Sequence, residues 1–137
     1  MNDKALKVST PISDIGMIVT ERIDCDSYNG TLKIIFINSN KANEVERYQC
    51  VFNSYITFKV THEDFDCDTD DVPKIKEPAS EYYGNVIRYL ESLWLSKYTE
   101  TTMYIHGNRD CPNHYFFVAI EDSIEVLSHD EPVITLM

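Results

Sequence analysis

Basic residues are scarce in this chain, and the shortage is greatest near its end. Of 137 residues, 12 are Lys or Arg and 23 are Asp or Glu, which gives a formal net charge of −11. No Lys or Arg follows Arg109, whereas six acids do. A protein that binds nucleic acid needs a basic surface to displace counterions from the phosphates, so we expect no nucleic-acid partner. A field of this sign attracts basic partners.

Long apolar runs and paired cysteines are also missing. No stretch approaches the ~20 apolar residues that span a bilayer, and no basic segment followed by an apolar run marks a secretory signal. The four cysteines are far apart and form no CxxC pair, and they are Cys25, Cys50, Cys67 and Cys111. We therefore expect a cytoplasmic protein with reduced cysteines, no disulfide framework and no membrane partner.

The motifs that usually mark an enzyme are absent as well. No Gly-x-Ser-x-Gly sequence occurs, and no cysteine lies in a sequence that suggests activation. The four glycines stand singly, so no glycine-rich loop could cradle a phosphate. The sequence thus predicts a protein that is not an enzyme and uses no cofactor.

Two short motifs come close to a metal site. Asp66, Asp68, Asp70 and Glu77 match part of the EF-hand spacing, but Asp71 stands where Gly permits the sharp turn, and a strand pattern precedes the motif. Cys111 and His114 are spaced like half of a zinc site, without a second pair. We predict no metal at either place, with a weak calcium site as the alternative near Asp66–Glu77 and zinc as the alternative near Cys111–His114.

The composition predicts one folded domain over residues 1–137. Hydrophobic residues make up 43% and aromatic residues 12% of the chain, which is ample for a core. Residues 1–13 are polar and contain Pro11, so we expect a loosely ordered lead-in. Residues 62–78 hold two prolines and many like charges, which predicts an acidic loop without regular structure.

An antiparallel meander is predicted before this loop. The strands 19–28 and 31–37 flank Asn29-Gly30, which is typical of a two-residue type I′ hairpin. Pairing outward from that turn sets Asp26 opposite Lys33 and Cys25 opposite Ile34. The alternating segments 45–52 and 55–61 then add two further strands in sequence.

After the loop, a helix is predicted from an N-cap at Ser80 to about Lys97. Its apolar residues recur at helical spacing and are Tyr83, Val86, Ile87, Leu90, Leu93 and Trp94. The remaining predicted elements are a strand over 101–105, a hairpin of 114–120 with 123–127 and an edge strand over 133–137. Glu125 is expected to point away from the core. The predicted fold class is α+β, a mostly antiparallel β-meander with one long amphipathic helix packed on one face and a C-terminal β-hairpin, with a sheet curled toward a half-barrel as an alternative.

Several segments resemble those of small bacterial proteins. These segments are 51–53 with Tyr55, 114–118, 124–128 and 131–132. Together with the length and the acidity, they make the chain similar in kind to immunity proteins of bacterial polymorphic-toxin and contact-dependent growth inhibition systems. The resemblance implies a short, cytoplasmic, non-enzymatic inhibitor that neutralises a cognate and often basic toxin domain. It carries over no individual functional residue.

The leading hypothesis is therefore an immunity protein that binds a basic toxin, a nuclease by preference, and blocks its active site through an acidic surface. The residues predicted to bind the partner are Asp64, Asp66, Asp68, Asp70, Asp71, Asp122, Asp130 and Glu131. A small-molecule or metal-binding enzyme or sensor with a site between helix and sheet is the first alternative. An adaptor subunit of an unrelated complex is the second.

Overall fold

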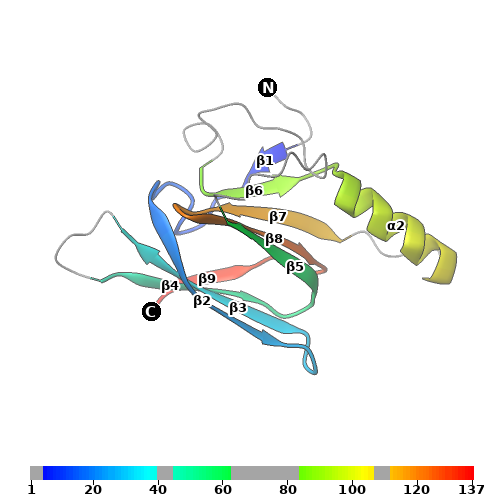
Figure 1. Cartoon of the computed structure of the whole chain (residues 1–137), viewed down its shortest axis with the longest axis horizontal. Coiled ribbons are helices and arrows are strands. Elements are labelled where there is room, and N and C mark those ends of the chain that lie inside the picture. Colours follow the sequence, from blue (N-terminus) through cyan, green and yellow to red (C-terminus); the bar gives the residue numbers. More distant parts are fainter. Residues whose placement is uncertain (1–4, 40–44, 63–83, 107–111) are drawn as a thin grey trace.

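Two antiparallel sheets face each other and enclose the core (Figure 1). The computed structural model describes residues 5–39, 45–62, 84–106 and 112–137. The first sheet contains, in order, β1 (Ala5–Lys7), β6 (Val86–Tyr89), β7 (Asn113–Val118), β8 (Asp122–Ser128) and β5 (Tyr55–His62). The second contains β2 (Ile18–Asp26), β3 (Thr31–Asn38), β4 (Arg47–Phe52) and β9 (Val133–Leu136). Within the described residues one helix, α2 (Leu93–His106), extends from the end of the first sheet (Figure 1), so the α+β class with antiparallel strands is confirmed.

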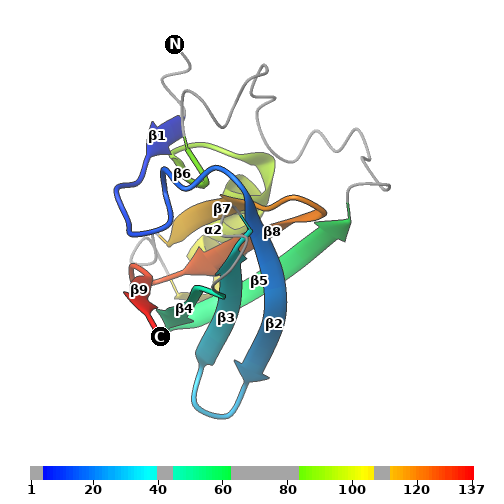
Figure 2. The same cartoon turned by 90° about the vertical axis from the view of Figure 1, so that its left-hand side faces the viewer.

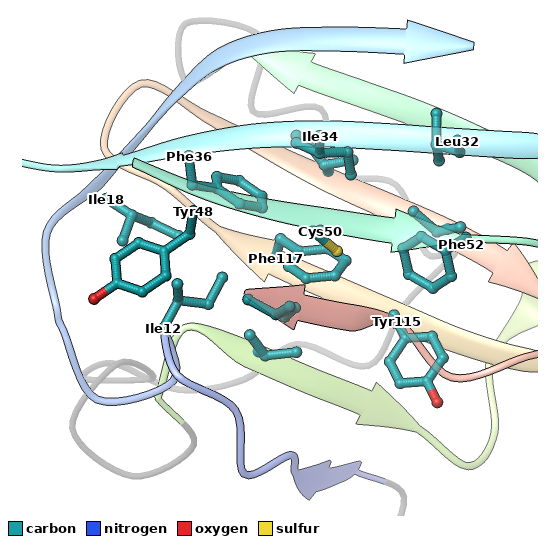
Figure 3. Packing of buried hydrophobic residues seen from close by; sticks show 14 residues of the cluster. Ile12, Ile18, Leu32, Ile34, Phe36, Tyr48, Cys50, Phe52, Tyr115 and Phe117 are labelled. Atoms are coloured by element: carbon teal, nitrogen blue, oxygen red, sulfur yellow. The ribbon is translucent and has the colours of Figure 1, made fainter. Parts of the chain in front are cut away.

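The core consists of alternate residues from both sheets. Phe36 of β3 stacks on Phe117 of β7 with ring centroids 5.5 Å apart, and Phe52 of β4 meets the same ring edge-on at 6.1 Å. Figure 3 shows these side chains filling the space between the sheets. Because successive strand residues point to opposite faces, every second residue of β3 and of β4 points into this layer, and most of these residues are apolar.

The first hairpin forms, but with a longer turn than predicted. Asp26 pairs with Thr31 and Cys25 with Leu32, so the loop has four residues, 27–30. Only Gly30 in it has a positive φ, of 71°, which excludes the type I′ turn. Asp26 explains the longer loop, because its carboxylate accepts hydrogen bonds from the backbone and side-chain nitrogens of Asn29 at 3.2 and 2.7 Å. These bonds lower the pKa of Asp26. The slip of two residues keeps Ile23 and Cys25 on their predicted face, whereas a β-bulge between Thr20 and Arg22 changes the face for the residues before it.

The meander holds for β2, β3 and β4, but β5 does not continue it. Instead β5 crosses to the other sheet and pairs with β8. The crossing at Asn53 and Ser54 is fixed by Asp130, whose carboxylate accepts both backbone N–H groups at 2.7 and 3.0 Å. The predicted edge strand at the end of the chain is confirmed, since β9 pairs with β4 at the edge of the second sheet.

The helix lies further along the chain than the sequence predicts. Val86–Tyr89, expected inside it, is strand β6, and the strand expected over 101–105 belongs to α2. The proposed N-cap, Ser80, lies outside the described residues; Ser92 caps α2 instead, by accepting the Leu95 backbone N–H at 3.0 Å. Val86 and Ile87 are β-branched and pair with Phe117 and Phe116 of β7, so strand pairing overrides the helical spacing.

The expected loose lead-in is wrong for the part that the structure describes. Strand β1 pairs with β6, and Ile12 and Ser13 have no exposed surface. Asn85, itself fully buried, holds the following turn: its side chain accepts the Gly16 N–H at 2.9 Å and donates to the Gly16 carbonyl at 2.8 Å. Of the predicted acidic loop, His62 is the last residue of β5, and 63–78 lie outside the described residues.

Candidate functional site

A cluster of polar side chains lies on the outer face of the first sheet, beneath the first turn of α2. His114 of β7, Glu125 of β8 and Lys59 of β5 point to this face, because their neighbours in the strands point into the core. Ser92 and Trp94 reach the cluster from α2. Glu125 thus points away from the sandwich core as predicted, yet it is only 4% exposed because the helix covers this part of the face.

The cluster forms a continuous chain of hydrogen bonds. The Ser92 Oγ lies 2.7 Å from His114 Nδ1, and His114 Nε2 lies 3.0 Å from Glu125 Oε1. The other carboxylate oxygen of Glu125 lies 3.4 Å from the Lys59 ammonium. Every side-chain nitrogen and oxygen in this series of contacts therefore has a partner, as buried polar groups require.

Aromatic rings close the cluster. The rings of Tyr89 and Trp94 both lie 5.2 Å from the imidazole of His114, and Trp94 meets it edge-on. The Lys59 ammonium lies 5.0 Å from the centre of the Trp94 ring, at cation–π distance. His114 is completely buried as a result.

A hydroxyl, an imidazole and a carboxylate in sequence are groups that can relay a proton. Here the serine hydroxyl already accepts the Leu95 N–H as the helix cap, and only 7% of Ser92 is exposed. A nucleophile must reach its substrate, and this one is covered. These hydrogen bonds join the N-terminus of α2 to β7 and β8, so the role that the geometry shows is to hold the helix on the sheet.

The partner-binding residues predicted within the described chain do not lie together. Asp122 begins β8, whereas Asp130 and Glu131 follow its end. Asp122 is the first of the seven residues of β8, and the distance from the first to the last of them is roughly 20 Å at ~3.4 Å per residue. Asp122 accepts a hydrogen bond from the Thr20 hydroxyl at 2.9 Å. Asp130 holds the crossing of β5, and Glu131 alone of the three is exposed.

The remaining predicted positions are not described. Asp64, Asp66, Asp68, Asp70 and Asp71 lie outside the described residues.

The metal candidates are not described in full either. Cys111 and the segment Asp66–Glu77 lie outside the described residues, and His114 belongs to the buried cluster. Within the part that the structure describes, no three His, Cys, Asp or Glu side chains are grouped to hold a metal ion. Cys25 is an exposed free thiol and Cys50 a buried one, and burial raises the pKa of the Cys50 thiol.

The sequence reasoning did not find this cluster, although part of it was within reach. The predicted hairpin of β7 and β8 places His114 and Glu125 on the same face, and the observed register makes them diagonal neighbours. Ser92 could not be found, because the predicted helix ran through it rather than starting after it.

Comparison of the chain with protein-family models, with curated proteins and with solved structures finds no match. Within the described residues, no helix has the length and apolar character needed to cross a membrane.

Proposed function

We propose that this chain is a non-enzymatic protein inhibitor of the immunity type, which binds a basic toxin domain in the cytoplasm and blocks its active site. The observation that carries the proposal is the charge: −11 over 137 residues, with eight acids against two lysines between His62 and Glu81. A toxin that acts on nucleic acid presents a basic surface to phosphates, and clustered carboxylates are complementary to it.

The polar cluster under α2 supports a binding role over a catalytic one. Its histidine is fully buried, and its serine and glutamate are at most 7% exposed. All of its hydrogen bonds are made within the protein, so it contributes rigidity to the fold. A rigid framework reduces the entropy lost when a partner docks.

Long-range attraction would govern how fast the complex forms. With opposite net charges, association rates of roughly 10⁸ M⁻¹s⁻¹ at low salt are expected, whereas buried apolar anchors would govern dissociation. We propose Asp64, Asp66, Asp68, Asp70 and Asp71 as the main steering residues. Asp122 and Asp130 would add to the negative electrostatic potential, although both also make hydrogen bonds that stabilise the fold.

The test uses the product of the adjacent gene, since immunity genes neighbour toxin genes. Cells that express this product should survive only when they also express the chain, and the association rate of the purified pair should fall steeply between 50 and 500 mM salt. A variant with Asp→Asn at all five steering residues should associate more slowly at low salt than a control variant in which five other acids are replaced by their amides. The matched set is Asp3, Asp14, Glu44, Glu91 and Glu100, which removes equal net charge. A rate that ignores salt, or a pair that does not bind, would refute the proposal.

A second candidate is an enzyme or sensor with its site between helix and sheet. One observation favours it: Ser92, His114 and Glu125 meet at that place. It requires α2 to move and uncover the imidazole. Two measurements on the purified native chain separate the candidates: metal analysis, and the reactivity of His114 toward diethyl pyrocarbonate. If the chain is an inhibitor, the buried imidazole of His114 should not react.

A further inference from the structure

The edge strands of the two sheets, β2 and β5, lie at the same side of the molecule. Figure 1 looks toward this side, and Figure 2 shows both strands at its right. Among the described strands, β2 has only β3 as a neighbour in its sheet, and β5 has only β8. An edge strand presents backbone donors and acceptors that a further strand can use. We call this side, formed by β2 and β5, the β2/β5 flank.

The flank is fixed at both ends. At one end the Tyr55 N–H donates to the Gly30 carbonyl at 3.2 Å, and the Tyr55 hydroxyl lies 2.6 Å from the Cys25 Sγ. At the other end the Ile120 N–H donates to the Ile18 carbonyl at 2.9 Å. The middle parts of both edge strands lie between these contacts.

Apolar side chains that face inward remain partly exposed along the flank. Val60 pairs with Ile124, which has no exposed surface, and points to the same face of the sheet, yet Val60 is 46% exposed. Cys25 likewise pairs with the fully buried Leu32 but is exposed. Ile23 of β2 is only partly buried. Ile124 and Leu32 on the next strands inward are thus fully buried, whereas no strand among the described residues covers the outer edges of β2 and β5.

The charges beside these side chains are mainly negative. Strand β2 carries three acids, Glu21, Asp24 and Asp26, and one base, Arg22, while β5 carries Lys59 and no acid. Arg22 pairs with Asp24, and Glu21 pairs with Arg47 of β4. Glu121 and Asp122 lie where β8 begins, close to the start of β2 through the bond from Thr20. A second copy of this acidic chain would meet like charges here, whereas a segment that alternates apolar and basic residues would meet opposite ones.

We propose that the β2/β5 flank is a strand-docking site for an extended segment of a partner protein in which apolar residues alternate with Lys or Arg. The apolar residues would cover Val60, Ile23 and Cys25, and the backbone would pair with an edge strand. The inference rests on the proposed function only for the basic charge of the partner.

The test uses the full chain and three synthetic ten-residue peptides with blocked termini. The first alternates Val and Lys, the second alternates Val and Glu, and the third has the residues of the first in two blocks. Titration followed by amide NMR should show binding of the first peptide alone. Shifts and slowed hydrogen exchange are expected at the amides of β2 and β5.

Two matched valine variants locate the contact. Val60→Asp should weaken binding of the alternating basic peptide by roughly tenfold or more, which corresponds to about 1.4 kcal/mol. Val133→Asp changes a similarly exposed valine on edge strand β9, at 55% against 46% for Val60, and should stay within about twofold. Val60→Thr keeps the side-chain shape and should lose about threefold, which secures the result if the aspartate impairs folding.

Three results would overturn the inference: equal binding of the block peptide, equal loss in the Val60 and Val133 variants, or shifts outside β2 and β5. Self-association of the chain through these strands, seen by sedimentation, would also overturn it. The peptide results do not depend on the adjacent gene product. If that product binds the Val60→Asp variant at full strength, the inhibitor proposal stands and the docking site is wrong.

Discussion

Gly84 makes the sharpest prediction about stability. Three glycines have positive φ angles, at 87° for Gly16, 71° for Gly30 and 74° for Gly84. A Cβ on Gly16 would meet no atom within 4 Å, whereas a Cβ on Gly84 would lie 2.3 Å from the carbonyl oxygen of Ser13. Alanine at the two positions therefore carries the same backbone cost, and only one variant adds a steric clash.

The magnitudes follow from these contacts. Gly16→Ala should cost about 1–2 kcal/mol, the penalty for an L-residue in the left-handed region. In Gly84→Ala the Ser13 carbonyl must also move, and this oxygen accepts the buried Asn85 N–H at 2.8 Å. Loss of such a bond adds about 1–3 kcal/mol, so the total is about 2–5 kcal/mol. A domain of this length has about 7–20 kcal/mol in total, so the variant should still fold.

Urea unfolding of the full chain, followed by far-ultraviolet circular dichroism, measures both variants. The midpoint of Gly84→Ala should lie below that of Gly16→Ala, with equal slopes. Gly30→Ala, whose Cβ would lie 3.8 Å from the Asn53 carbonyl oxygen, should behave like Gly16→Ala. If Gly84→Ala costs no more than Gly16→Ala, the packing of Gly84 against Ser13 is wrong.

Three further predictions use the same unfolding assay. Glu125→Ala leaves the buried His114 Nε2 without its acceptor and should cost about 2–4 kcal/mol, whereas Glu125→Gln, which keeps an oxygen there, should cost less than half as much; equal costs would contradict this. Asp130→Ala should cost about 1–2 kcal/mol and Glu131→Ala less than about 0.5, because only Asp130 holds the crossing of β5; the reverse order would exclude that role. Burial raises the pKa of Tyr115 to about 12 from its usual 10. The folded phenol thus stays protonated where the unfolded one ionises, so stability should fall as the pH rises from about 10 to 12, and Tyr115→Phe should flatten this slope.

Strand alternation made most of the sheets predictable. Period-two patterns identify β3, β4, β5, β7 and β8 to within a few residues, because one face of each strand is buried. The register of the first hairpin was missed by two residues, since the Asp26–Asn29 bonds that lengthen the turn depend on exact geometry. Which sheet receives β5 could not be read locally, because the crossing is held by Asp130, far away in the sequence.

The helix shows how two signals can merge. Val86 and Ile87 belong to a strand and Leu93 and Trp94 to a helix, yet their combined spacing imitates one long helix. Ser92, the residue that caps α2, lies inside the single long helix that this spacing predicted. The polar cluster was therefore hidden, since half of it depends on where the helix begins.

The chain's single tryptophan, Trp94, lies at the contact between α2 and the first sheet, against His114 and Lys59. Its emission thus reports whether α2 is packed on the sheet, while the far-ultraviolet circular dichroism signal reports the secondary structure of the whole chain. The two optical signals would separate if the helix lifts away before the strands melt, and they would coincide if the molecule unfolds as one cooperative unit. The protein therefore carries a built-in reporter for the motion that exposure of its buried imidazole would require.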